Sequence, residues 1–188
     1  MSPLYVVLIH HPVYDKNGQI VATAVTNMDV HDLARIGKTF GVRGVFIATP
    51  VRALRLLAEK IIEHWQHGFG AQYNETRRVA LDLVRAVSDL DAAILEIERE
   101  NGETPILVAT SAREGKARIP FPDLRARLAS NLSPHLLILG TGWGLAEEVI
   151  DRAQLILEPI RGVGDYNHLP VRAAAAIMLD RLLGTLRG

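Results

Sequence analysis

The sequence predicts an α/β protein with a mainly parallel sheet and helices on both faces. Apolar runs of strand length alternate with segments of helical periodicity along the whole chain. The strand-length runs are continuously apolar rather than alternating, which is typical of strands buried on both faces. Two late runs each lead into a glycine-rich loop and then a helix, the arrangement with which α/β proteins build a pocket at the carboxyl ends of parallel strands.

Composition sets limits on the function. The chain has 188 residues, of which 48% are hydrophobic, so we expect residues 1–188 to form one domain with a substantial core. Its 21 basic and 21 acidic residues balance, so any nucleic-acid site must be a local patch. The absence of cysteine excludes thiol catalysis and disulfides. No signal peptide or run of about 20 apolar residues is present, so we expect a cytoplasmic protein without a membrane partner.

The first half of the chain is predicted to hold three core strands, over residues 4–9, 45–48 and 84–87, with a further short strand within 20–25. A turn is expected at Asn17-Gly18. Helical spacing predicts helices over about 27–40, 50–66 and 75–83, with Asn27 and Asp29 as candidate N-caps of the first. Residues 67–74, which contain two glycines, are expected to form a loop.

The second half continues the alternation. A helix capped by Asp89 or Asp91 should end at Asn101-Gly102. Strands are expected over 106–109, 136–139 and 155–157, and helices over 123–132, 145–153 and 169–184. The last helix is apolar nearly all round, so we expect it to be buried both on its own sheet and against another subunit.

Several polar patterns could carry chemistry, and each has a plainer interpretation. Asp29, Asp32 and Arg35 are spaced three apart and so share one side of a helix, where N-capping and a surface ion pair would also explain them. The loop "GTGWG" at 140–144 suits either a cofactor or a tight strand–helix turn. The basic residues of 113–127 suit either phosphate binding or a solvated face. No histidine has the spacing of a metal site, so we predict none.

Three segments, in the right order, resemble the SPOUT (SpoU–TrmD) superfamily of S-adenosylmethionine-dependent RNA methyltransferases. "TNMDVHDLARIGKTFGVRGVFI", at 26–47, is similar to the first motif of SpoU-type enzymes, with Arg35 on the catalytic arginine and Asp29 where asparagine is usual. "LLILGTGWGL" resembles the second motif, a strand and glycine-rich cofactor loop. "LEPIRGVGDYNHLPVRAAAAIML" resembles the third.

The chain departs from the SpoU pattern in two places. Gly142 and Trp143 stand where the second loop usually carries a glutamate, and His31-Asp32 replace a small residue in the first motif. The whole length is more similar to a small bacterial branch of predicted RNA methyltransferases.

The resemblance implies a fold, a cofactor and an activity. The fold would be a parallel α/β sheet with a C-terminal deep trefoil knot, and the enzyme a homodimer, paired through the C-terminal helix, with sites at the interface. It would methylate a base or ribose of structured RNA, tRNA or rRNA. The resemblance places S-adenosylmethionine among the second- and third-motif residues Leu139, Gly140, Gly142, Gly144, Leu157, Ile160, Gly162, Gly164, Asn167 and Leu169, together with Thr110.

Catalysis is assigned to the first motif. Arg35 would orient RNA phosphate or help to activate the acceptor, His31 is the better base by pKa, and Asp29 lies beside them. Because loops at the carboxyl ends of parallel strands share one edge, we expect RNA contacts from His10, His11, Asn27, Arg113 and Lys116. A non-catalytic knotted RNA-binding or dimerisation module, and a nucleotide-binding α/β protein, remain open as alternatives.

Overall fold

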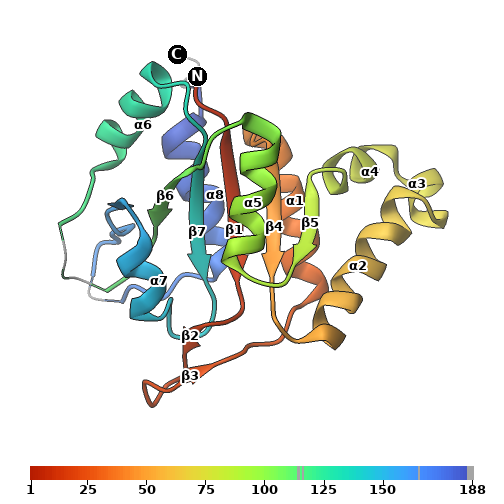
Figure 1. The fold of residues 1–188 in the computed structure, drawn as a ribbon, viewed down its shortest axis with the longest axis horizontal. Helices are drawn as coiled ribbons and strands as arrows, with labels where there is room; N and C mark the ends of the chain where they lie inside the picture. The colour runs from red at the N-terminus through yellow and green to blue at the C-terminus, as the bar shows by residue number, and fades with distance from the viewer. Residues whose placement is uncertain (114, 116, 165, 186–188) are drawn as a thin grey trace.

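The computed structural model describes residues 1–113, 115, 117–164 and 166–185, and its main feature is a six-stranded parallel sheet in the order β5-β4-β1-β7-β6-β8 (Figure 1). The strands are β1 Leu4–Ile9, β4 Gly44–Ala48, β5 Val84–Val87, β6 Ile106–Ala109, β7 His135–Gly140 and β8 Leu155–Ile156. A small antiparallel hairpin, β2 Val13–Tyr14 and β3 Ile20–Val21, follows β1. The predicted α/β class with a mainly parallel sheet is confirmed.

The central strand β1 explains why continuous apolar runs fold this way. Every residue of β1 is buried, with at most 4% of its surface exposed. Side chains of a strand alternate between the two faces of a sheet. Accordingly Leu4, Val6 and Leu8 enter one core while Tyr5, Val7 and Ile9 enter the other.

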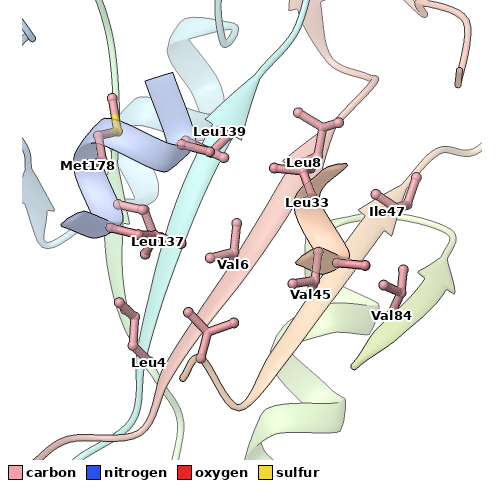
Figure 2. Close-up of a cluster of buried hydrophobic side chains, with 14 of the residues drawn as sticks. Leu4, Val6, Leu8, Leu33, Val45, Ile47, Val84, Leu137, Leu139 and Met178 are labelled. Atoms are coloured by element: carbon pink, nitrogen blue, oxygen red, sulfur yellow. The ribbon is translucent and has the colours of Figure 1, made fainter. Parts of the chain in front are cut away.

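Helices cover both faces of the sheet. On the Leu8 face lie α1 Asn27–Phe40, α2 Arg52–Gln66, α4 Glu75–Leu81, α6 Phe121–Ser130 and α8 Val171–Leu183. Figure 2 shows Leu33 of α1 and Met178 of α8 in this core beside Leu8 and Leu137. On the other face lie α5 Leu90–Asn101 and α7 Glu147–Arg152. The short helix α3 Phe69–Tyr73 lies with α2 and α4 beyond the β5 edge (Figure 1).

Two local predictions were wrong. Residues 69–73 form α3 instead of a loop. The helix was not predicted because five residues are too few to show helical periodicity. The N-cap of α1 is Thr26 rather than Asn27 or Asp29: its hydroxyl accepts a hydrogen bond from the Asp29 N–H at 3.2 Å, and the Asp29 carboxylate accepts from the Thr26 N–H at 3.1 Å. This capping box satisfies two backbone donors, and the helix begins at Asn27 as predicted.

The last helix finds most of its cover within its own chain. Ala175, Met178, Leu179 and Leu182 are buried in the core shared with α1 and α6. Ala175, which the helical wheel alone would make a candidate for subunit contact, is completely buried in its own chain, whereas Ala173 and Ala176 stay partly exposed. Pairing with a second copy therefore stays a prediction, and its candidate face is the one that carries Ala173 and Ala176.

After β8 the chain is held against the segment that joins β6 to α6. Leu157 forms a parallel bridge with Ile119, and the Glu158 carboxylate accepts a hydrogen bond from the Phe121 N–H at 2.7 Å. The trefoil knot that the family resemblance implies stays a prediction. Within the described part of the chain, no helix has both the length and the apolar character needed to cross a membrane.

Candidate functional site

A cavity of about 1030 Å³ opens at the carboxyl ends of β6 and β7. Its walls come from the segment after β6, the glycine-rich loop after β7, the segment between β8 and α8, and the first two turns of α8. The described lining residues are 110–113, 139–145, 159–160, 167–171, 174 and 178. A pocket of this kind is the usual place for a small ligand in an α/β fold.

The glycine-rich loop owes its shape to its own glycines. A Cβ on Gly140 would lie 2.8 Å from the backbone nitrogen of Leu145, and Gly142 and Gly144 adopt φ values of 58° and 104°. The Trp143 N–H donates to the Tyr14 carbonyl, and the Tyr14 N–H donates to the Gly144 carbonyl, each at 2.9 Å. The loop is thus a tight turn, fastened to the β2–β3 hairpin, that also forms one wall of the cavity.

The chemistry of the walls suits a ligand that is part apolar and part polar. Leu139, Ile160 and Met178 provide apolar surface. Helix α8 begins with Pro170 as its N-cap and has no side-chain cap, so the N–H groups of its first turn remain available beside the cavity. Arg113 stands on the rim, and no carboxylate is found among the described lining residues.

The structure brings together most of the residues assigned to the cofactor, since eight of them line the cavity: Thr110, Leu139, Gly140, Gly142, Gly144, Ile160, Asn167 and Leu169. Three do not. Leu157 is completely buried, and Gly162 and Gly164 are exposed where an added Cβ would meet open space.

Asp29 and Arg35, from the first motif, lie on the side of α1 that faces α8. Asp29 is only 5% exposed, and its carboxylate pairs with Arg172 of α8 at 2.9 Å (Nη1–Oδ1). The same guanidinium pairs with Asp32 at 3.1 Å (Nε–Oδ2). Arg172 was missed by sequence reasoning, although it is the one charged residue in the first turn of α8. The predicted ion-pair partner, Arg35, is instead exposed.

Arg35 borders a shallow groove of about 440 Å³ between α1 and α8, which is separate from the cavity. Its other lining residues are Asp32, Ile36, Thr39, Phe40, Arg172, Ala173 and Ala176. In one chain, therefore, Arg35 does not reach the cavity wall.

His31 faces away from α8. It is 8% exposed, and its ring packs edge-on against the Trp65 ring of α2 with a centroid distance of 5.2 Å. Its Nδ1 finds no hydrogen-bond partner among the residues that the structure describes. Burial, and then the nearby Arg77 guanidinium, lowers the pKa of His31. The structure does not bring His31 to the cavity, and its role as a base stays a prediction.

His10 is completely buried, which argues against the predicted direct contact with RNA. Its Nδ1 lies 3.0 Å from the Thr23 hydroxyl, which lies 2.5 Å from the hydroxyl of the cavity residue Thr141. His10 thus supports the cavity wall from behind. Its pKa is lowered by burial, and the charge of Asp29 opposes that shift.

The other residues assigned to RNA are nearer the surface. His11 is half-buried, Asn27 is exposed at the start of α1, and Arg113 is exposed on the cavity rim. Lys116 lies outside the described residues.

Residues 3–184 match the family of SAM-dependent RNA methyltransferases, and the chain belongs to that family. It is 45% identical over 181 residues to a tRNA (guanine-N(1)-)-methyltransferase of Oleidesulfovibrio alaskensis, covering 96% of this chain and 42% of that protein. It is 38% identical to an uncharacterized protein of Aquifex aeolicus, covering 98% of this chain and 90% of that protein. The chain thus spans less than half the length of the relatives that carry a functional name.

Solved structures of low sequence identity share the fold. A probable methylase family protein from Haemophilus influenzae is 17% identical with a TM-score of 0.64, over 96% of this chain and 65% of that one. A TrmH/SpoU tRNA modifying enzyme from A. aeolicus is 17% identical with a TM-score of 0.56, over 97% of this chain and 75% of that one. The predicted family and the predicted α/β fold with a mainly parallel sheet are confirmed, and S-adenosylmethionine is the cofactor of the family.

The burial of His10 predicts a pH dependence of stability. Because the folded state lowers the pKa of His10, the unfolded chain takes up the proton first as the pH falls below about 6.5. Stability is then full above that pH and is lost below it, by at most about 1.4 kcal/mol per pH unit for one histidine. Urea unfolding between about pH 7.5 and pH 5 should show a smaller loss for His10→Gln than for the wild type. An identical loss in both proteins would contradict the assignment.

Proposed function

We propose that residues 1–188 form one methyltransferase domain that transfers the methyl group of S-adenosylmethionine to tRNA. The observation that carries the proposal is the cavity between the glycine-rich loop and the start of α8, in a chain whose residues 3–184 match the family. The name of the O. alaskensis relative makes a guanine base of tRNA the first acceptor to test. Because the proposed substrate is tRNA, we also propose a cytoplasmic location.

The cavity residues fit the donor. The side chains of Leu139, Ile160 and Met178 would contact its apolar surface. Free N–H groups at the start of α8 would bind its polar and anionic groups. When bound, S-adenosylmethionine supplies an activated methyl group on a sulfonium.

The acceptor must be aligned with that methyl group and must lose a proton. The Arg35 guanidinium stays charged at any physiological pH, so it would orient RNA phosphate or stabilise charge on the acceptor rather than act as a base. Arg35 is exposed and outside the cavity of its own chain. In this proposal it acts on RNA at an interface between two copies.

The α1–α8 groove supports pairing of two copies. Ile36, Phe40, Ala173 and Ala176 give it a partly exposed apolar lining, and the two alanines let another helix approach closely. A homodimer formed there would bring Arg35 to the interface, which agrees with the family resemblance.

The donor pocket is tested by two glycines that sequence reasoning treated alike. Gly140→Ala places a Cβ 2.8 Å from the backbone of Leu145, so the loop must shift and donor affinity should fall about tenfold or more. Gly162→Ala meets open space and should bind as the wild type does. Calorimetric titration with S-adenosylmethionine measures both. Equal affinity of the two variants would place the pocket elsewhere.

The homodimer is tested by Ala176→Glu. The larger glutamate side chain blocks the close approach of a second helix that the small alanine allows, and this overpacking should cost about 1–3 kcal/mol, enough to move the protein toward monomer. Ala126→Glu on the exposed side of α6 is the matched control. Sedimentation velocity at micromolar concentration reads the assembly state. A wild type that is already monomeric would end the proposal.

Activity is tested with total tRNA from a strain that lacks the protein, so that the target nucleotide is unmodified. Arg35→Ala should reduce transfer of labelled methyl by orders of magnitude while barely changing donor affinity, because Arg35 lies outside the donor cavity. Arg99→Ala, exposed on α5, is the control, and sedimentation checks that Arg35→Ala keeps its assembly state. If Arg35→Ala transfers methyl groups at the wild-type rate, Arg35 is not catalytic. RNA binding without any transfer by the wild type would favour the non-catalytic module.

A further inference from the structure

Three ring side chains gather at the mouth of the cavity. Trp143 comes from the glycine-rich loop, whereas Tyr166 and His168 come from the segment before α8. The ring centroids of Trp143 and His168 are 6.4 Å apart, and those of Tyr166 and His168 are 5.3 Å apart. Trp143 and His168 line the cavity itself.

These rings are left open to solvent. Trp143 is 56% exposed and Tyr166 is 81% exposed. The ring of Trp143 is tilted by 59° to that of His168 and not stacked on it, so it keeps a face for another planar group. Exposed aromatic surface at the mouth of a cavity is a mark of a binding site.

The backbone of Trp143 is held from two sides. Its N–H donates to the Tyr14 carbonyl at 2.9 Å, and its carbonyl accepts from the Arg113 guanidinium at 3.1 Å. Arg113 in turn lies over the Tyr14 ring, 5.2 Å from its centroid. The exposed indole is therefore presented by a fixed loop, which reduces the entropy lost when a ligand stacks on it.

Charge selects among planar ligands. The described cavity lining carries the Arg113 cation and no carboxylate. Aromatic faces beside a cation match an unstacked nucleotide, whose base stacks while its phosphate meets the positive charge.

We propose that Trp143, with Tyr166 and His168, forms a stacking platform for an unpaired base of the RNA substrate, and that Arg113 contacts an adjoining phosphate. The proposal rests on the proposed function and adds how the substrate is recognised. The adenine of S-adenosylmethionine is also planar and offers the same surface for stacking. The test therefore distinguishes stacking of this adenine from stacking of an RNA base.

Tryptophan fluorescence shows whether the base that stacks on Trp143 comes from the donor or from the RNA. The chain has two tryptophans, so Trp65→Phe leaves Trp143 as the single reporter. With S-adenosylmethionine already saturating, total tRNA from a strain that lacks the protein should quench this emission further. Quenching completed by S-adenosylmethionine alone, with no change on adding tRNA, would assign the ring to the donor and overturn the proposal.

Substitutions of the platform residues provide a second, independent test, in which tRNA binding is measured. With S-adenosylmethionine saturating, Trp143→Ala should weaken tRNA binding about tenfold to a hundredfold, and Trp143→Phe should restore most of it. Tyr166→Ala should weaken tRNA binding in the same direction, and because its side chain is 81% exposed it leaves the core intact. Tyr73→Ala, which removes an aromatic side chain of similar exposure on α3, is the matched control. If the wild type methylates no RNA, the proposed function fails. If it does, and both Trp143→Ala and Tyr166→Ala bind tRNA as the wild type does, only the platform fails.

Discussion

The pairing of β1 with a parallel partner on each side is the constraint from which the site follows. Ile9 is in register with Ala48 of β4 and with Gly140 of β7. The ladder of backbone hydrogen bonds continues one residue past the ends of β1 and β7. The His10 N–H donates to the Ala48 carbonyl, and the Thr141 N–H donates to the Ile9 carbonyl. The loops after β1, β4 and β7 therefore leave the sheet at one level, and the buried core on both faces fixes that level.

A second constraint ties the first motif to the cavity. Asp29 completes the capping box of α1 and also pairs with Arg172 at the start of α8. Removing Arg172 would leave the nearly buried Asp29 carboxylate without its ion-pair partner, which is far costlier than losing an exposed ion pair. The start of α1 and the start of α8 are thus held in one geometry, and Val171, the neighbour of Arg172, is part of the cavity wall.

Local sequence patterns were enough to predict most of the fold, but they did not predict the contacts between the residues of the site. The core strands were predictable because strands buried on both faces are continuously apolar, and Gly102 ends α5 in the left-handed conformation that glycine favours. The pairing of Arg172 with Asp29 joins residues 143 positions apart, which no local spacing can reveal. Glycine content alone could not separate Gly140, packed against Leu145, from the open Gly162. His10 looked like a loop residue, but the β1 ladder carries it into the interior.

The composition of α8 can now be given a physical cause. A helix on a domain surface normally has one apolar stripe, yet three sides of α8 meet three different surroundings. Ala175 and Leu179 face the core, Ala174 and Met178 also line the cavity, and Ala173 and Ala176 line the groove that Arg35 borders. In the proposed enzyme one helix therefore separates the donor from the face where a second copy would bring its Arg35. Small side chains keep that partition thin, and a polar residue on any of these sides would have to find a partner in the core, the cavity or the groove, as Arg172 does with Asp29 and Asp32.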